Sequence, residues 1–169
     1  MLYAAWNGAM PATAAIVPVT TGTSIKTLMQ LKANANASFK VKSWGMSFDG
    51  ITAATPIRCE LVETGTIGGT SGVAYVAADI YPYENAAGEA WIGQLGAGNS
   101  LYSTGATAIT SGTPTAVRIG DYQLVAPTNQ YLYDWVLSNE FQVQAGHFLQ
   151  VRVTAAAAVN AICFVKIEQ

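Results

Sequence analysis

The stretch from Phe141 to Ile167 places the strongest constraint on the fold of this chain. Apolar side chains alternate with polar ones at Leu149, Val151 and Val153, and the alternation resumes after the small residues 155–158. A period of two is the pattern of a β-strand that buries one face. Two such segments on either side of a short turn predict an antiparallel hairpin, which is a common way to close a β-sandwich.

Similar alternation recurs along the rest of the chain, and no helical period longer than two turns accompanies it. These patterns predict further strands at 16–20, 24–32, 38–49, 55–64, 73–80, 117–125 and 130–137. A change of phase predicts a bulge near Ser43–Gly45, because a change of face within one strand needs an extra residue.

The tally of about eight strands predicts an all-β fold. We expect a single antiparallel β-sandwich that resembles a jelly roll, with a loop region rich in Gly, Ala, Ser and Thr at 81–115. Residues 1–13 lack a sustained period and are interpreted as an N-terminal arm, which leaves 14–169 as the sandwich domain. Aromatic side chains in such an arm have to dock on their own domain or on a neighbour.

Charged residues make up 11% of the 169 residues, against about 25% in an average soluble domain. Two interpretations fit: a secreted domain with a Ser/Thr/Gly surface, or a subunit that buries much of its surface against neighbours. We favour the subunit, because interface cores are depleted of charge. The net charge of −2 argues against a nucleic-acid partner, which would need a basic footprint.

No apolar run is long enough to predict a membrane span. The N-terminal segment lacks the basic region and compact apolar core of a signal peptide, so we expect synthesis in the cytoplasm.

Residues that could carry chemistry are sparse. The single histidine, His147, lies in a turn and is interpreted as an exposed or capping residue, since a triad or metal site would need companions. Most carboxylates occupy turns or outward strand positions and are interpreted as solvated, although Asp121 with Asp134 stays open as a glycosidase pair. The sequence therefore predicts no catalytic residue, metal ligand or cofactor, and no enzyme.

The two cysteines are each in phase with apolar neighbours. Cys59 and Cys163 are therefore interpreted as free buried thiols, with a disulfide as the alternative if their strands lie close together.

Aromatic residues are the remaining candidates for function. Tyr131, Tyr133 and Trp135 share one face of a predicted strand, and we expect them to contact a neighbouring subunit or a shell. The arm residues expected to do the same are Leu2, Tyr3 and Trp6. As an alternative, aromatic side chains such as Trp91 and Tyr83 would form a sugar-stacking platform.

Five segments taken together are similar to small structural proteins of tailed bacteriophages. They are WGMSFDG at 44–50, TPIRCELVETG at 55–65, YLYDW at 131–135, AGHFLQVRVTA at 145–155 and VNAICF at 159–164. Their order and spacing fit over roughly residues 24–167. The loop region 81–115 resembles nothing in that group.

This resemblance implies a non-enzymatic virion protein that decorates or cements a capsid. The implied partners are the chain itself as a homo-oligomer, a trimer first, and the major capsid protein. The implied location is the capsid surface of a virion assembled in the host cytoplasm. Two alternatives stay open: a carbohydrate-binding or receptor-binding module, and a phage tail or head–tail connector subunit.

Overall fold

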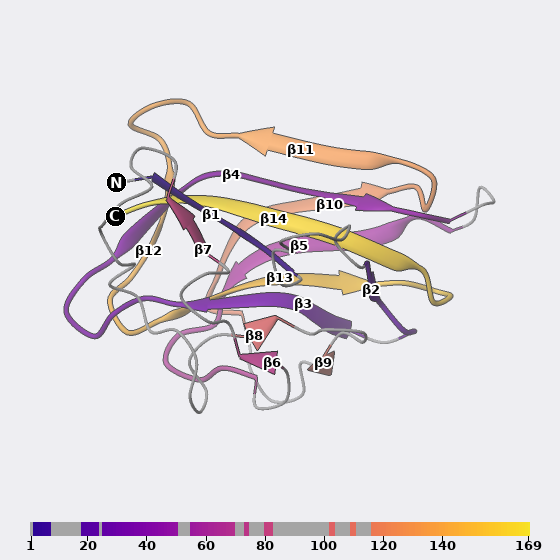
Figure 1. Ribbon diagram of the computed structural model, residues 1–169, viewed down its shortest axis with the longest axis horizontal. Helices are drawn as coiled ribbons and strands as arrows, with labels where there is room; N and C mark the ends of the chain where they lie inside the picture. Colours follow the sequence, from indigo (N-terminus) through magenta and orange to yellow (C-terminus); the bar gives the residue numbers. More distant parts are fainter. Residues whose placement is uncertain are drawn as a thin grey trace.

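A computed structural model describes residues 2–7, 18–23, 25–50, 55–69, 73–74, 80–82, 102–103, 109–110 and 116–169. Within these ranges there are fourteen strands and no helix, so no helix of that part could cross a membrane. The strands form two antiparallel sheets that pack against each other (Figure 1). The predicted all-β sandwich is confirmed.

Sheet A has the strand order β11-β4-β14-β1-β7, with β12 also paired to β4 and β2 to β14. Its strands are β1 (Leu2–Trp6), β2 (Val19–Thr20), β4 (Phe39–Phe48), β7 (Ile80–Pro82), β11 (Gln130–Asp134), β12 (Phe141–Val143) and β14 (Asn160–Glu168).

Sheet B has the order β10-β5-β13-β3-β8-β6, with β9 paired to β3. Its strands are β3 (Ile25–Lys32), β5 (Ile57–Glu63), β6 (Val73–Ala74), β8 (Tyr102–Ser103), β9 (Ile109–Thr110), β10 (Arg118–Val125) and β13 (Phe148–Thr154).

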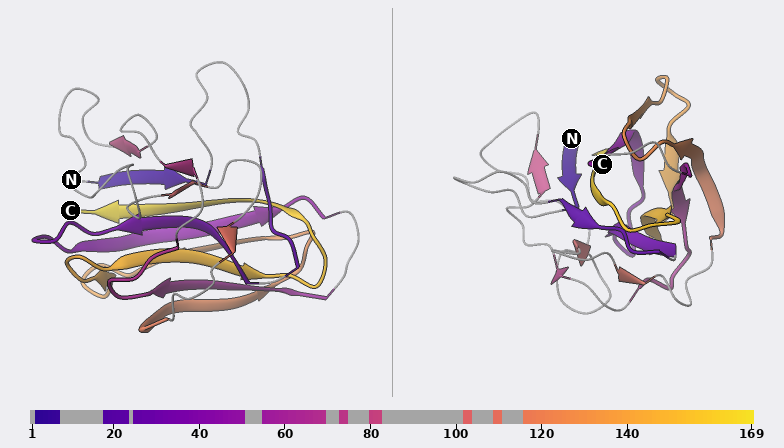
Figure 2. Two further views of the ribbon diagram at one scale, coloured as in Figure 1. Left: turned by 90° about the horizontal axis from the view of Figure 1, so that it is seen from below. Right: turned by 90° about the vertical axis from the view of Figure 1, so that its right-hand side faces the viewer.

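The eight longest strands pair in a nested way. The outermost pair is β1 with β14, followed inward by β3 with β13, β4 with β11, and β5 with β10. This is the arrangement of a long hairpin wound into two sheets, which is a jelly roll. The nesting brings both ends of the chain to one end of the sandwich, as Figure 1 shows, and the layers are seen edge-on in Figure 2.

The core lies between the two sheets. Ile57, Cys59 and Leu61 of β5 are buried, as their alternation predicts, and they meet buried residues of sheet A such as Trp44 and Val165. Burial of roughly 1.5–3 kcal/mol for each large apolar side chain makes this continuous core the main source of stability.

The predicted C-terminal hairpin is wrong. β13 pairs with β3 and β5 in sheet B, whereas β14 pairs with β1, β2 and β4 in sheet A. The residues between them, 155–159, therefore cross from one sheet to the other. Alternation records that one face of each strand is buried, and two strands that face each other across a core satisfy it as well as two neighbours in a sheet.

The other predictions have mixed outcomes. Leu2–Trp6 form strand β1 instead of an arm, with Tyr3 buried, and 8–13 lie outside the described residues. The bulge of β4 falls at Lys42, where the register with β14 shifts, just before the predicted position. Most of the loop region 81–115 also lies outside the described residues.

Candidate functional site

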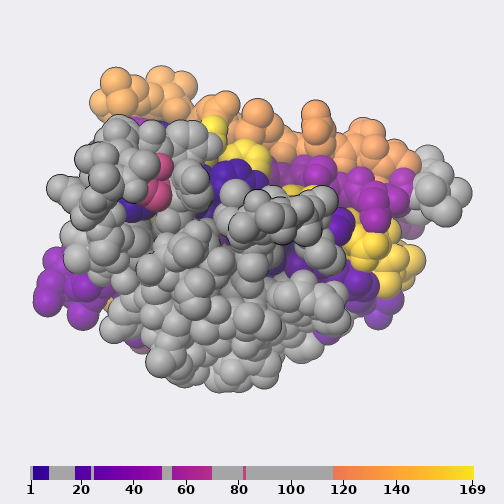
Figure 3. All heavy atoms as spheres, in the orientation of Figure 1, coloured from indigo at the N-terminus to yellow at the C-terminus, as the bar shows by residue number. Residues whose placement is uncertain are grey.

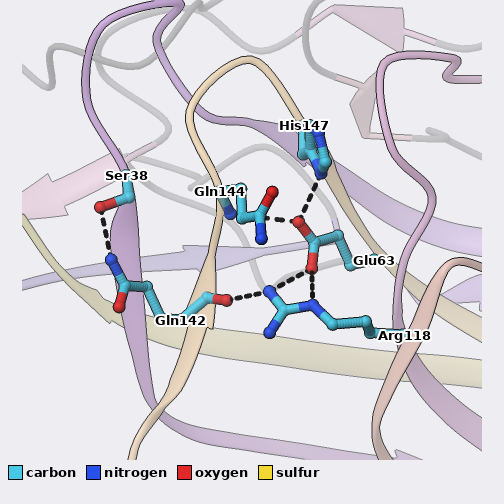
Figure 4. Close-up of polar contacts among 6 residues, drawn as sticks. All are labelled: Ser38, Glu63, Arg118, Gln142, Gln144 and His147. Carbon is cyan, nitrogen blue, oxygen red and sulfur yellow. Dashed lines mark hydrogen bonds and ion pairs between the residues drawn. The ribbon is translucent and has the colours of Figure 1, made fainter.

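A buried carboxylate lies at one end of the sandwich. Glu63, the last residue of β5, has no exposed surface, and its Oε2 accepts from Nε of Arg118 at 2.6 Å. Its Oε1 lies 2.6 Å from Nδ1 of His147 and accepts from the backbone N–H of Gln144 at 3.1 Å (Figure 4). The prediction of solvated carboxylates is therefore wrong for Glu63, because three groups from distant segments enclose it.

The surrounding bonds hold several loops to this end of the sandwich. Arg118 also donates to the carbonyl of Gln142 and lies over the ring of Phe141, with 5.0 Å between the guanidinium carbon and the ring centroid. Gln142 in turn donates to the hydroxyl of Ser38 at 2.8 Å. The cluster thus ties β5 and β10 to the β12–β13 turn and to the loop before β4.

This cluster has the composition of a charge relay without its geometry. A nucleophilic site needs a hydroxyl or thiol hydrogen-bonded to the histidine, which the carboxylate orients from its other side. Here the cluster's hydroxyl, on Ser38, is bonded to Gln142. A buried ion pair of this kind orders the segments that meet at it. We therefore interpret the Glu63 cluster as structural, and His147 as a half-buried turn residue bonded to Glu63 instead of an exposed cap.

A second polar cluster joins the two sheets at the side formed by their edge strands, β11 of sheet A and β10 of sheet B. Oδ2 of Asp121, on β10, accepts from the hydroxyl of Tyr131 at 2.6 Å and from Nε1 of Trp44 at 3.0 Å. Burial and the adjacent Asp121 carboxylate raise the pKa of the Tyr131 phenol well above its usual range, so the phenol remains a donor. Asp134 is exposed on the opposite face of β11, so it does not form the facing pair with Asp121 that a glycosidase would need.

The outer face of β10 is apolar and exposed. Because β10 pairs with β5 in register, its residues opposite Val62, Glu60 and Arg58 point outward. These outward residues are Ile119, Tyr122 and Leu124, of which Ile119 and Leu124 are each 62% exposed. We call these three the β10 outer face. Contiguous exposed apolar side chains are uncommon on monomeric proteins and mark contact surfaces.

The turn after β11 presents two more apolar side chains. Val136 and Leu137 are 76% and 77% exposed, and Ser138 that follows has a φ of 72°. The backbone N–H of Asn139 donates to the carbonyl of Val136 at 3.0 Å. The turn is therefore closed by its own backbone hydrogen bond. We call Val136 and Leu137 the apolar tip.

The predicted contact residues are distributed between core and surface. Tyr3 is buried, and Trp6 packs on Phe164 of β14 with 6.3 Å between ring centroids. Tyr131 and Trp135 pack against the core, while Tyr133 is exposed and lies edge-on to Trp135. The alternation identifies the shared face of Tyr131, Tyr133 and Trp135 correctly, but that face is turned largely toward the sandwich.

The last of the predicted contact residues, Leu2, is half-buried at the start of β1. Trp91 and Tyr83, the residues of the predicted sugar-stacking platform, lie outside the described residues.

An apolar row crosses the outer face of sheet A. Leu132, Gly45, Phe164 and Trp6 are successive register partners on β11, β4, β14 and β1. A Cβ at Gly45 would lie 2.8 Å from a ring carbon of Phe164 and 2.8 Å from the backbone oxygen of Tyr131, so only glycine fits beneath the ring. A shallow groove of about 190 Å³ runs beside the row.

No site for a metal or a nucleophile stands out in the part of the chain that the structure describes. That part contains no group of three or more metal-ligating side chains. Cys59 and Cys163 are both free and buried, and burial raises the pKa of Cys59 to about 12. The alternative of a disulfide is therefore excluded in this structure.

A pocket of about 620 Å³ lies at the end of the sandwich away from the termini. Its carboxylate, on Asp49, accepts from the side-chain amide of Asn160 at 2.8 Å, and Asn160 also accepts from the hydroxyl of Thr20 at 2.8 Å. These polar groups are therefore used in holding the loops together.

Comparisons with protein-family models, with curated proteins and with solved structures found no match to this chain. The case for a function rests on the surfaces described above and on the sequence.

Proposed function

We propose that this chain is a non-enzymatic structural protein that decorates or cements the capsid of a tailed bacteriophage. It acts as a homo-oligomer and contacts the major capsid protein. The observation that carries the proposal is the β10 outer face, whose exposed apolar residues belong to a chain with an unusually low content of charge. Surfaces of this kind gain stability when they are covered by another protein.

Three further features support an assembly role. The rigid cluster at Glu63 orders loops without offering a reactive group, as expected of a scaffold. The nested jelly roll is a fold found in viral capsid and lectin domains, although a fold by itself does not establish a function. The five segments that are similar to phage structural proteins include β4, β5, β11, β13 and β14 at least in part, and these are five of the eight longest strands.

Binding to the shell would stabilise it by mass action. A protein that binds the assembled shell and not its separated subunits shifts the equilibrium toward the shell in proportion to occupancy. Apolar burial at the β10 outer face would supply much of the driving force, since none of its three residues is charged, and Glu60 and Arg58 opposite them on β5 border the contact.

The test is co-sedimentation of the purified chain with capsids that lack it. We expect the chain to sediment with the shells, and the shells to resist a higher temperature. Ile119→Lys and Leu124→Lys should weaken binding at least tenfold, because each places a charge in an apolar contact. Ile67→Lys is the matched control, since Ile67 is 61% exposed but lies outside β10, in the loop after β5. Absence of binding by the unaltered chain would overturn the proposal.

A second candidate function is binding of a carbohydrate or a receptor glycan. The apolar row on sheet A favours it, because Phe164 and Trp6 lie side by side there and aromatic rings stack on sugars. Tryptophan fluorescence titrated with a panel of glycans would detect it, and Phe164→Ala should then abolish the change. This function predicts ligand binding by the isolated chain, which shell decoration does not.

A further inference from the structure

We infer that two copies of this chain associate by pairing their β11 strands antiparallel across a two-fold axis at Leu132, so that sheet A becomes continuous through the dimer. This inference deepens the proposed homo-oligomer and names the surface that forms it. The partner is a second copy of the chain.

The first observation is that β11 ends sheet A. Among the described strands it pairs with β4 alone, and in Figure 1 it lies along the outer margin of the sheet. The orange segment that contains it also forms the upper margin of the space-filling view in Figure 3. Leu132 and Tyr133, on opposite faces of the strand, are 58% and 42% exposed.

The second observation concerns the direction of the backbone groups. The N–H of Trp135 donates to the carbonyl of Lys42, and the N–H of Phe48 donates to the carbonyl of Asn129. Hydrogen-bonded and non-hydrogen-bonded pairs alternate along an antiparallel ladder. The register with β4 then directs the backbone groups of Tyr131 and Tyr133 toward β4. The groups of the alternate residues point outward to the open edge, and these residues are Gln130, Leu132 and Asp134.

The third observation is that, among the described residues, this edge has none of the usual protections except the charge of Asp134. Natural edge strands are protected by lysines, prolines, bulges or covering segments. β11 has the sequence QYLYD, with no lysine or proline, and its register with β4 is unbroken. By contrast β10, the edge of sheet B, carries a bulge between Ile119 and Asp121.

The sequence of β11 is complementary to itself in the antiparallel direction. A two-fold axis at Leu132 places Leu132 opposite its own copy and Tyr131 opposite Tyr133 of the copy. It also places Gln130 opposite Asp134, so an amide donor faces the strand's single carboxylate and no two like charges meet. Apolar, aromatic and polar cross-strand pairs of this kind each stabilise a sheet. This self-complementary register, in which each Asp134 faces an amide donor and not a second carboxylate, is what singles out a second copy as the partner.

The same register extends the contact beyond the strand. Continued antiparallel pairing would bring the apolar tip of one copy, Val136 and Leu137, beside the Pro127–Thr128 turn of the other. The tip is then covered in the dimer. This explains why Val136 and Leu137, two of the most exposed apolar side chains among the described residues, are exposed in the single chain.

The inference is tested first by solution mass as a function of concentration, measured by sedimentation equilibrium on the full chain. We expect a concentration-dependent rise from 17.7 kDa to twice that mass. Leu132→Pro should weaken association about tenfold or more, because it removes an outward donor at the axis but none directed to β4. Leu132→Lys should also weaken it by placing two like charges at the axis, whereas the equally exposed Ile67→Lys should not.

Amide hydrogen exchange gives a second readout that does not depend on any variant. The amides of Tyr131 and Tyr133 should be protected at every concentration, since they donate to β4. The amides of Gln130, Leu132 and Asp134 should become protected only as the dimer forms. A chain that stays monomeric, a closed trimer, or a dimer whose outward amides exchange freely would each overturn the inference. Shell binding by a monomer or a trimer would overturn the inference and leave the proposed function standing.

Discussion

The hydroxyl of Tyr131 on β11 donates to the carboxylate of Asp121 on β10 across 2.6 Å, joining sheet A to sheet B at the open side of the sandwich. The indole N–H of buried Trp44 donates to the same oxygen at 3.0 Å. One carboxylate on β10 is therefore bonded to both β11 and β4 through two charge-assisted hydrogen bonds.

Removal of the phenol hydroxyl should loosen this side of the sandwich. We expect Tyr131→Phe to lower the free energy of unfolding by about 1.5–3 kcal/mol, the range for hydrogen bonds to charged groups. Urea unfolding at a fixed protein concentration measures it, with Tyr122→Phe on the exposed face of β10 as the control. Equal stabilities for the two variants would contradict a structural role for the bond.

Asp121→Ala should cost more than Tyr131→Phe, because it leaves the buried N–H of Trp44 and the phenol without their acceptor. A double-mutant cycle between Asp121 and Tyr131 isolates the energy of the pair. A coupling energy near zero would show that the two residues act independently.

Glu63 should be among the most sensitive positions in the chain. Its replacement by Ala removes the acceptor of Arg118 and of the Gln144 N–H and the partner of His147, and loss of hydrogen bonds to a charged group costs about 1.5–3 kcal/mol. Thermal or urea unfolding measures the loss, and Glu168→Ala is the comparison, because the Glu168 side chain is 45% exposed in its pair with Lys42. We expect the Glu168 variant to lose much less, and the reverse order would contradict the structure.

The Glu140–Lys42 pair should make stability depend on acid pH. The Lys42 ammonium, 2.7 Å from the Glu140 carboxylate, lowers the pKa of Glu140 to about 2 from an ordinary value of 4.5. A depressed pKa means that the unfolded state binds more protons in that window. The contribution of Glu140 is therefore present above pH 4.5 and is lost as the pH falls toward 2.

Urea unfolding at a series of pH values measures this dependence. Glu140→Gln should flatten the stability curve between about pH 2 and 5 relative to the unaltered chain. Glu168→Gln, which removes the more exposed partner of Lys42, should flatten it less. An unchanged slope in the Glu140 variant would show that the carboxylate is solvated in the folded state.

The two thiols should be unreactive in the folded chain. Cys59 and Cys163 are buried, and burial raises the pKa of both, so little thiolate forms and reagents cannot reach it. A chromogenic disulfide reagent should titrate two thiols per chain in denaturant and almost none in native buffer. Rapid native reaction of either thiol would mean that the core opens far more often than its packing indicates.

Much of the fold was already determined by the sequence. Alternation located most of the long strands and identified Ile57, Cys59 and Leu61 as an inward face, because the side-chain period of a strand is two whatever its neighbours are. The same pattern failed at the start of the chain, where only five residues form β1 and the signal was too short to detect. The low content of charge pointed to assembly before any surface was known.

Tertiary structure alone decided which strands are neighbours and which polar groups are buried. β13 and β14 alternate as a hairpin would, yet they lie in opposite sheets, because alternation reports burial of a face and not the identity of the pairing strand. Glu63 looks like any glutamate near a strand end, and its partners Arg118 and His147 are 55 and 84 positions away in sequence. The open edge of β11 is also a property of the assembled sheet, since a strand becomes an edge only when the topology places no other strand beside it.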